Sequence, residues 1–415
     1  MLKLNEVTAI VYDSSGLYTN IAIKLAKTYK RVFYYHNWSH DYPTPKHTEV
    51  GKGFDTIEHT LYPFDHYDEI DLWIFPSLFD SDLQVFLEKQ GKLVWGAREG
   101  EVMEINRWDF IEYQKKIGMA VSPSKLVKGI TELRKELYTG DDGRFVKIDA
   151  NNRGAMETFK YINEEISEIC DIRPLEHSLG MKSELMNFIV QDKIDCKCET
   201  GYDGFTIDGE FPSTALFGIE VKDMGYIGGV RPYKKLPDSV TQINEEIAPA
   251  LKEYGYRGNI STEVREGVDG KNYLIDLTCR QPYPPTNSML VIWDNMAECM
   301  FEGAQGNLVD MEFNDYFVCE VMMFSDSAKT DYFTLFYPDK YKDNIFQPYI
   351  TFMNGRQWVI PQDIANTNVG SIVATGVTLE GAVNKCKEIA DEITGHHLKI
   401  DFACLDSAIK QFKDL

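Results

Sequence analysis

The sequence predicts a protein of several domains with α/β and α+β architecture. The N-terminal region alternates short apolar runs with helical segments, which is typical of a parallel α/β layer. The middle of the chain instead has strand-like runs separated by Asp-Gly pairs, which favour tight turns between antiparallel strands. The chain has 415 residues, which is too long for one typical core, so we expect two to four domains.

The first 97 residues are predicted to form a Rossmann-like domain with a parallel sheet. The turn after the first expected strand, Asp13 to Gly16, contains one glycine and lacks the GxGxxG pattern of a dinucleotide site. We therefore expect no nicotinamide site in this domain. The expected strands are 7–12, 31–36, 72–76 and 92–96, and the expected helices are 17–28 and 81–90.

The next expected domain, 98–187, begins with helices and continues into a strand. Residues 144–150 alternate apolar side chains around Lys147, and this period of two indicates a strand. Residues 156–168 and 175–182 are expected to be helical or connecting. The two expected helices lie within 105–118 and 130–137.

The third expected domain, 188–312, contains several strands and one helix, and residues 313–415 are expected to form a small C-terminal α+β domain. A strand, a turn and an amphipathic helix are expected within 369–393. In the third domain we expect turns at Asp203-Gly204 and Asp208-Gly209, a glycine-containing loop at 222–237, a helix at 239–254 and a hairpin at 256–280.

Composition excludes several classes of function. Hydrophobic residues make up 43% of the chain, which is typical of a packed globular protein. The net charge of −22 argues against binding of nucleic acid or an anionic membrane surface. The N-terminus has no apolar signal region, and the eight scattered cysteines form no CxxC pair, so we expect a cytoplasmic protein with reduced thiols and no zinc site.

The hairpin at 256–280 carries the strongest functional pattern. Its turn contains Asp269-Gly270, a strong hairpin signal. Asp276, Thr278 and Arg280 are spaced by two, so they share one face of the second strand, and Glu263 lies in the first. Two carboxylates, a hydroxyl and an arginine suit the binding of Mg²⁺ and phosphates. The alternative is an ordinary polar face with a surface ion pair.

Six segments, in this order, resemble the ATP-grasp superfamily, and within it the phosphoribosylamine–glycine ligases, also called glycinamide ribonucleotide synthetases. The resemblance extends over about residues 90–400 and rests on the order of the segments, since no single motif is decisive. The segments are 94–127, FVKIDANNRG at 145–154, FIVQDKIDCKCE at 188–199, DMGYIGGVRPYKKLP at 223–237, YRG…LIDLTCR at 256–280, and SIVATGVTLEGAVNKC at 371–386.

The resemblance implies an ATP-grasp fold with the Rossmann-like domain at 1–97, ATP-grasp subdomains at 98–187 and 188–312, and the C-terminal domain at 313–415. It also implies ATP and Mg²⁺ as cofactors, with Mn²⁺ as a substitute for Mg²⁺. The residues assigned to ATP on this basis are Arg107 and Lys147 for its phosphates, Arg153 in the loop after the lysine strand, Gln191 and Asp192 for adenine and ribose, and Glu199 for ribose or the metal.

The remaining roles concern the metal and the substrates. Glu263, Asp276 and Thr278 are the expected metal ligands. Arg280 and Lys147 are the expected catalytic residues, because cations stabilise a phosphoryl group in transfer. Arg280 is also assigned to the substrate, together with Gly228, Gly229 and Arg231. The ordinary alternatives are surface cations for the basic residues, solvated strand edges for 191–199 and a plain turn for the glycines.

The chain also departs from the family pattern. The phosphate loop has one glycine, Gly154, a threonine stands at 278 in place of a metal-binding asparagine, and the acceptor segment reads QPYPP at 281–285. The resemblance predicts a carboxylate–amine ligase that forms an acyl phosphate and acts on a small amino-acid-like acid and an amine, as a monomer or homodimer. The departures keep two alternatives open: an ATP-grasp protein that has lost turnover and only binds a nucleotide or protein partner, and a phosphoryl transferase on the same scaffold.

Overall fold

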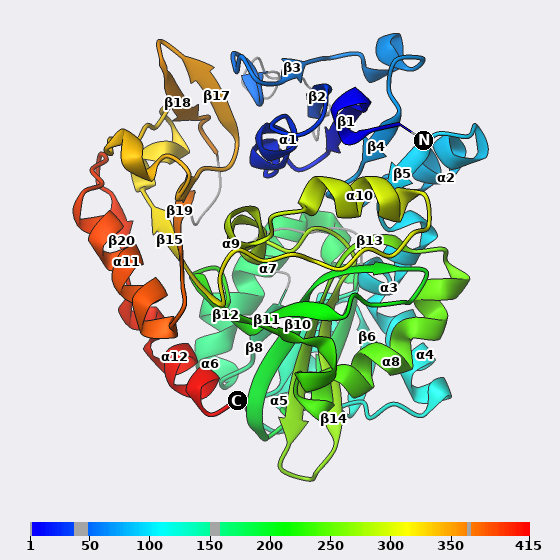
Figure 1. Ribbon diagram of the computed structural model, residues 1–415. Helices are drawn as coiled ribbons and strands as arrows, with labels where there is room; N and C mark the ends of the chain where they lie inside the picture. Colours follow the sequence, from blue (N-terminus) through cyan, green and yellow to red (C-terminus); the bar gives the residue numbers. More distant parts are fainter. Residues whose placement is uncertain (1, 37–48, 150–157, 363–366) are drawn as a thin grey trace. The chain divides into compact units, whose positions relative to one another are not determined.

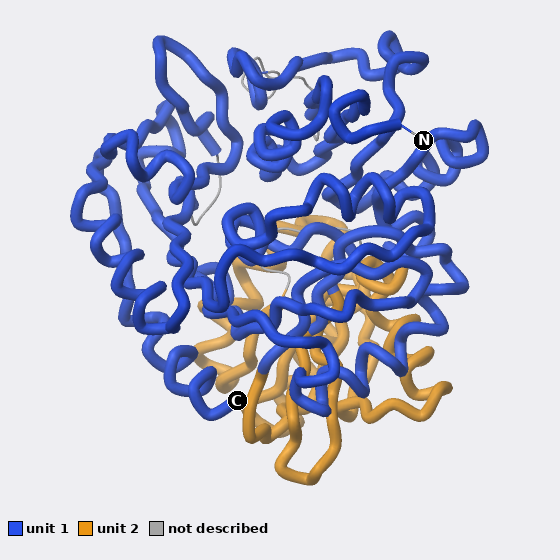
Figure 2. The backbone as a smooth tube through the Cα atoms, in the orientation of Figure 1, with its two compact units in different colours: residues 1–101, 200–262, 278–415 blue, residues 102–199, 263–277 orange. Residues whose placement is uncertain are grey.

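The computed structural model describes residues 2–36, 49–149, 158–362 and 367–415. The chain divides into two compact units, shown in blue and orange in Figure 2. Unit 1 comprises Met1–Glu101, Thr200–Thr262 and Thr278–Leu415, and unit 2 comprises Val102–Glu199 and Glu263–Leu277. The predicted division into four domains at 97, 187 and 312 stays a prediction.

The N-terminal part of unit 1 is the predicted parallel sheet, with strand order β3-β2-β1-β4-β5. Ala9 and Val11 belong to one buried cluster, whereas Ile10 and Trp73 belong to another, so the sheet buries apolar side chains on both faces. The elements are β1 (Thr8–Asp13), α1 (Thr19–Leu25), β2 (Arg31–His36), β3 (Glu58–His59), β4 (Leu72–Ile74), α2 (Ser81–Lys89) and β5 (Leu93–Trp95) (Figure 1).

Unit 1 also contains an antiparallel sheet, in which β10, β11, β12, β15, β19 and β16 are neighbours in that order. Three strands contain residues of both units. The strand β10 begins in unit 2 and ends in unit 1, whereas β13 begins in unit 1 and ends in unit 2. The strand β14 begins in unit 2 and ends at Thr278, the first residue of the last segment of unit 1. The bounds are β10 (Cys196–Ile207), β11 (Thr214–Val221), β12 (Gly225–Pro232), β13 (Arg257–Gly267), β14 (Asn272–Thr278), β15 (Phe317–Phe324), β16 (Ile345–Phe346), β19 (Asn368–Gly376) and β20 (Lys399–Ile400), with β17 (Ile350–Met353) and β18 (Arg356–Val359) forming a separate pair.

Two predictions in this region are wrong. Asp203-Gly204 is not a turn but lies inside β10, because the Asp203 carboxylate is buried and accepts hydrogen bonds from the Tyr226 hydroxyl at 2.6 Å and the Ser261 hydroxyl at 2.7 Å. The expected loop at 222–237 contains the strand β12, which pairs with β11 and β15. The predicted turn at Asp208-Gly209 is confirmed, with both residues at positive φ.

The helices α1, α9 and α10 of unit 1 contribute side chains to one large buried core. Trp95 and Trp293 are both buried in it, and Tyr29 of the N-terminal part donates a hydrogen bond to the carbonyl of Ala297 at 2.6 Å. The predicted strand, turn and helix within 369–393 are confirmed as β19 and α11. The helices are α8 (Asp238–Glu253), α9 (Pro285–Ile292), α10 (Met296–Ala304), α11 (Leu379–Asp391) and α12 (Asp406–Lys413).

Unit 2 contains a four-stranded antiparallel sheet with strand order β6-β9-β7-β8. Leu133 and Leu137 of α5 and Leu175 and Leu179 of α7 join the buried cluster that includes Val146 of the sheet. The strand β8 was missed by the sequence analysis, which expected helix or connection there. The elements are α3 (Val102–Ile105), α4 (Arg107–Ile117), β6 (Ser124–Lys128), α5 (Ile130–Tyr138), β7 (Phe145–Ile148), β8 (Thr158–Lys160), α6 (Glu164–Ser167), α7 (Arg173–Leu179) and β9 (Asn187–Gln191).

None of the helices in the described ranges combines the length and apolar character that a membrane span requires.

Candidate functional site

Lys147 lies in the middle of β7, as the alternating pattern predicts. Its neighbours Val146 and Ile148 are buried in the core of unit 2. Successive side chains of a strand point to opposite faces, so Lys147 points away from that core. Its Nζ atom donates a hydrogen bond of 2.9 Å to the main-chain carbonyl of Ile275 on β14. The lysine is therefore held against the strand that also carries Asp276.

Glu199, Glu263 and Arg265 form a charged cluster in unit 2, close to Lys147. Arg265 Nε donates to a Glu199 carboxylate oxygen at 2.6 Å, and the Glu199 and Glu263 carboxyl groups are hydrogen bonded to each other. Burial opposes ionisation of Glu199, but the hydrogen bonds from Glu263 and Arg265 and the charge of Lys147 outweigh it and lower the pKa of Glu199. Two adjacent acids beside two cations suit the binding of a metal ion with phosphates.

Arg265 was missed by the sequence analysis. It lies two residues after Glu263 on β13, so the two side chains share a strand face. The same spacing rule that grouped Asp276 with Thr278 would have found it. Its guanidinium also lies 5.7 Å from the ring centre of Phe145, which fixes the cation between Glu199 and an aromatic side chain of β7.

Arg107 lies at the first residue of α4, and this helix start contacts the end of β7. Arg107 Nη1 donates to the carbonyl of Ile148 at 3.2 Å, and the Trp108 main-chain N–H donates to Asp149 Oδ1 at 3.0 Å. Burial raises the pKa of Asp149, and the Trp108 hydrogen bond opposes this effect. The structure thus brings the start of α4 into contact with the end of β7, and both segments were predicted from the sequence to bind the ATP phosphates. Arg153, assigned to the same task, lies outside the described residues.

Gln191 is the last residue of β9, the strand predicted to lie against adenine and ribose, and Asp192 directly follows it. Gln191 pairs with Phe145 across the sheet, and its amide donates to the Ser124 hydroxyl at 3.1 Å. Asp192 is exposed, and its main-chain groups bond Pro123 and Ser122. Their assignment to the nucleotide stays a prediction.

The predicted hairpin is confirmed as β13 and β14, with Gly270 in the turn at φ 79°. Leu277 and Cys279 are buried, whereas Asp276, Thr278 and Arg280 between and around them are only partly buried. This alternation agrees with the prediction that the three polar residues share one face of β14 and its extension.

The residues present fit Mg²⁺ in the manner of nucleotide enzymes. In the described ranges no group of three or more His, Cys, Asp or Glu side chains is arranged to hold a metal by itself. Mg²⁺ in phosphate-transferring sites usually takes one or two carboxylates and completes its shell with phosphate and water. Glu263 and Asp276 are two carboxylates of this kind, and Thr278 has a neutral oxygen two residues along β14, and their metal roles stay a prediction.

Packing accounts for the glycines at 228 and 229. A Cβ atom at Gly228 would lie 2.4 Å from the ring of Tyr226, and one at Gly229 would lie 2.8 Å from the ring of Phe412. Arg231 donates to the main-chain oxygen of Leu415 at 3.1 Å and stacks on Phe217. The assignment of these three residues to a substrate stays a prediction, and the residues already have structural partners.

The acceptor segment at 281–285, which departs from the family pattern, is held by other parts of unit 1. The Tyr18 hydroxyl donates to the carbonyl of Gln281 at 2.6 Å, and Asn368 donates to the Tyr283 hydroxyl at 2.8 Å. Arg280 Nη1 lies 3.5 Å from the same Gln281 carbonyl. The N-terminal part of unit 1 therefore helps to position the segment that follows the predicted catalytic arginine.

The turn after β1 is organised by an acid instead of a phosphate. The buried Asp13 carboxylate accepts hydrogen bonds from the main-chain N–H groups of Ser15, Gly16 and Tyr18 at 2.8–2.9 Å and from the Tyr34 hydroxyl at 2.8 Å. In a dinucleotide site such N–H groups bind the pyrophosphate. Here they are already satisfied by a side chain of the same charge sign.

Comparison with solved structures identifies the fold. The phosphoribosylamine–glycine ligase of Thermotoga maritima superposes with a TM-score of 0.68 at 16% identity, covering 95% of this chain and 99% of that one. The chain has the ATP-grasp fold. The biotin carboxylase domain of Hydrogenobacter thermophilus 2-oxoglutarate carboxylase, solved with MgADP, ADP and bicarbonate, matches with a TM-score of 0.64 at 13% identity over 94% of this chain and 91% of that one.

A third match is the N5-carboxyaminoimidazole ribonucleotide synthetase of T. maritima, with a TM-score of 0.58 at 14% identity over 94% of this chain and 99% of that one. No protein-family model and no curated protein sequence matches the chain. The chain is thus similar in structure to ATP-grasp ligases and carboxylases, and its ATP-grasp fold agrees with the resemblance found in the six sequence segments.

Proposed function

We propose that the chain is an ATP-dependent carboxylate–amine ligase of the ATP-grasp type. The observation that carries this proposal is the cluster of Lys147, Glu199, Glu263 and Arg265 in unit 2, on the strands that the resemblance assigns to ATP and the metal. The proposed substrates are a small amino-acid-like acid and an amine of the phosphoribosylamine type.

The proposed reaction has two steps. A carboxylate oxygen of the acid attacks the γ-phosphorus of ATP, and ADP leaves with the electron pair of the broken P–O bond. The amine nitrogen then attacks the acyl carbon, phosphate leaves, and the nitrogen loses a proton. Both steps develop negative charge on phosphate oxygens, and this charge is stabilised by positioned cations.

The residues of this chain supply those charges. Lys147 and Arg107 are proposed to bind the α- and β-phosphates, with Arg153 in the following loop. Arg280 is proposed to stabilise the transferred phosphoryl group. Glu263 and Asp276, with Thr278, would hold Mg²⁺, which supplies charge neutralisation for phosphoryl transfer when bound.

The test is release of ADP from Mg²⁺-ATP with a panel of amino acids and bicarbonate, each with and without an amine such as phosphoribosylamine. We expect release that requires one acid and one amine. Asp276→Asn is expected to lower the rate by about a hundredfold or more, because a metal ligand has lost its charge. Asp269→Asn, in the exposed turn of the same hairpin, is the matched control and is expected to keep the wild-type rate.

Other outcomes would favour the alternatives. Tight binding of ATP without ADP release in the presence of any acid would contradict the ligase and support a protein that has lost turnover. ADP release that leaves a stable phosphorylated acceptor and no amide would support a phosphoryl transferase. Equal rates of ADP release for Asp276→Asn and the wild type would contradict the proposed metal site.

A further inference from the structure

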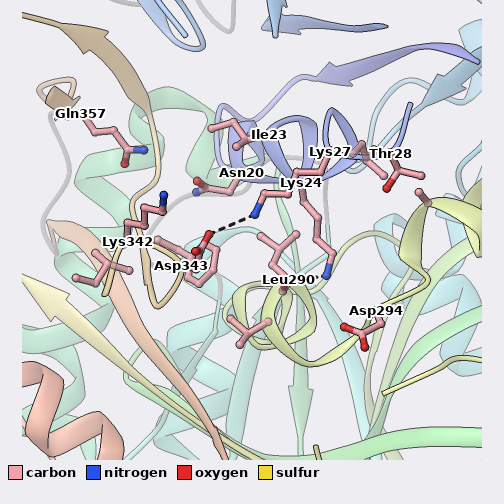
Figure 3. Close-up of a pocket in the computed structure, with 15 residues that line it drawn as sticks. Asn20, Ile23, Lys24, Lys27, Thr28, Leu290, Asp294, Lys342, Asp343 and Gln357 are labelled. Carbon is pink, nitrogen blue, oxygen red and sulfur yellow. Dashed lines mark hydrogen bonds and ion pairs between the residues drawn. The ribbon is translucent and has the colours of Figure 1, made fainter. Parts of the chain in front are cut away.

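A cavity of about 370 Å³ lies beside α1 within unit 1 (Figure 3). Its wall is formed by one side of α1, by α9 and the residues after it, and by residues 342–346 with Gln357 of β18. It contains none of the residues assigned above to ATP, metal or substrate. Cavities of this volume are at the lower end of the range that binds small organic molecules.

The charges of the cavity wall are three lysines and two aspartates, so the wall carries a net charge of +1 in a chain whose net charge is −22. Lys27 forms an ion pair with Asp343 at 3.2 Å, which Figure 3 shows as a dashed line. Lys24 donates to the carbonyls of Leu290 at 2.8 Å and Trp293 at 2.5 Å, near the end of α9. These two cations are therefore already engaged by the protein.

Lys342 differs from the other two lysines. Within the described ranges its ammonium group has no hydrogen bond or ion pair, and the side-chain amide of Gln357 likewise has no hydrogen-bond partner there. Figure 3 shows both side chains at the same end of the cavity. A cation and an amide donor at the same end of a cavity can together bind one carboxylate.

Apolar side chains also line part of the wall. Ile23, Leu290, Val291 and Phe346 line it, and Leu290 belongs to the buried core of unit 1. An apolar wall binds the hydrocarbon part of a ligand by removing it from water. The wall contains no arginine, the residue best suited to a phosphate dianion.

We propose that this cavity binds a small organic carboxylate with an apolar body, whose carboxylate contacts Lys342 and Gln357 and whose body contacts Ile23, Leu290 and Phe346. This site is additional to the proposed ligase reaction and uses none of its residues.

The test is calorimetric titration of the full-length protein with phenylacetate, with the neutral phenylacetamide and with inorganic phosphate. We expect saturable binding of phenylacetate and at least about tenfold weaker binding of phenylacetamide, because the amide cannot pair with the ammonium group. Lys342→Gln is expected to weaken phenylacetate binding by about tenfold. Lys385→Gln, an exposed lysine on α11 away from the cavity wall, is the matched control and is expected to bind as the wild type does.

Two further variants keep the test decisive. Val291→Phe is expected to fill the apolar part and abolish binding while the thermal unfolding transition stays cooperative. Asp276→Asn is expected to bind phenylacetate normally, so failure of the ligase proposal and failure of this one are distinguishable. The proposal is overturned if phenylacetamide or phosphate binds as tightly as phenylacetate, if Lys342→Gln binds like the wild type, or if no saturable binding occurs.

Discussion

The Nζ atom of Lys147 donates a hydrogen bond to the main-chain carbonyl of Ile275 across 2.9 Å. The lysine is in the middle of β7, and Ile275 directly precedes Asp276 on β14. The two partners are 128 residues apart in sequence, so only folding of unit 2 brings them together. This contact holds Lys147 beside the strand that carries Asp276, as the proposed phosphate and metal roles of the two residues require.

Replacement of Lys147 by methionine is the first prediction. The substitution keeps the length of the side chain and removes its charge, so we expect nucleotide affinity to fall by at least about tenfold. Loss of the hydrogen bond to Ile275 is expected to lower the free energy of unfolding by only about 1 kcal/mol. Titration of the protein with Mg²⁺-ADP measures the first effect and urea denaturation the second.

The matched control for this experiment is Lys160→Met on the neighbouring strand β8, where the lysine is exposed. It is expected to bind Mg²⁺-ADP as tightly as the wild type does. If both variants bind Mg²⁺-ADP equally well, the proposed phosphate role of Lys147 is wrong. The lysine would then contribute only to stability, through its hydrogen bond to Ile275.

Replacement of Arg265 by methionine is the second prediction. The change leaves the adjacent carboxyl groups of Glu199 and Glu263 without their nearest guanidinium, so we expect the free energy of unfolding to fall by about 1–3 kcal/mol at pH 7. The pKa of Glu199 is lowered in the folded state, so its contribution to stability is present above the unfolded pKa and is lost as pH falls through the folded pKa. The difference between variant and wild type should therefore shrink in acid.

Urea denaturation at pH 7 and near pH 4 checks this prediction. Lys197→Met is the control, because Lys197 forms an exposed ion pair with Glu266 at 2.7 Å near the same hairpin. Exposed pairs contribute about 0–1 kcal/mol, so this variant should unfold almost like the wild type. A cost for Arg265→Met that is no larger than that of the control would show that the charged cluster is not held by the arginine.

Replacement of Glu320 by glutamine is the third prediction. Glu320 is fully buried on β15 and accepts hydrogen bonds from the Ser288 hydroxyl at 2.8 Å and from Asn287 at 3.1 Å. Burial raises its pKa from 4.5 to about 7, and the hydrogen bonds oppose this effect. The folded protein therefore binds the proton more tightly than the unfolded chain does, and the free energy of unfolding falls as pH rises from about 4.5 to about 7.

The glutamine cannot titrate, so this part of the pH dependence should disappear in the variant. At about 1.4 kcal/mol per pKa unit, the fall in stability between pH 5 and pH 8 should be smaller in Glu320→Gln by on the order of 2–3 kcal/mol. Urea denaturation at pH 5 and at pH 8 measures this fall in the free energy of unfolding. The control is Glu253→Gln, at an exposed position on α8. Parallel pH profiles for wild type and Glu320→Gln would contradict the raised pKa.

Alanine at Gly218 or Gly228 is the fourth prediction. A Cβ atom would lie 2.3 Å from the Tyr226 ring at Gly218 and 2.4 Å from it at Gly228. The ring cannot move freely, since its hydroxyl donates to the buried Asp203. Each variant should lose about 1–3 kcal/mol of stability, as overpacked cores do.

Thermal unfolding of the two variants provides the measurement. If Gly228 were needed only to let a substrate come close to the main chain, Gly228→Ala would leave the melting temperature unchanged, whereas Gly218→Ala would lower it. An equal fall in both would show that the two glycines make room for one tyrosine.

Local patterns predicted many elements well. The strand at Arg31–His36 has the predicted bounds, and the turn at Asp269-Gly270 joins two paired strands as expected. The helix α8 begins and ends within one residue of the predicted 239–254. These features depend on the period of apolar residues and on turn chemistry, which are properties of neighbouring residues.

The errors occurred where distant residues override local preference. Asp203-Gly204 has the composition of a turn, but hydroxyl groups from Tyr226 and Ser261 bond the aspartate inside β10. The segment 222–237 has the glycines of a loop, but it contains β12, which pairs with β11 and β15, and a Cβ atom at Gly229 would meet the distant ring of Phe412. A local pattern contains no information about partners that lie more than 20 residues away.

By itself, the sequence determined the alternation of strands and helices, the polar face of β14 and the order of segments typical of ATP-grasp proteins, because each depends on spacing along the chain. Only the tertiary structure decided that Arg265 joins Glu199 and Glu263, that Lys147 reaches Ile275, and that Lys342 faces a cavity. Those relationships arise when separate strands and helices pack, which sets distances between side chains that the order of residues does not record.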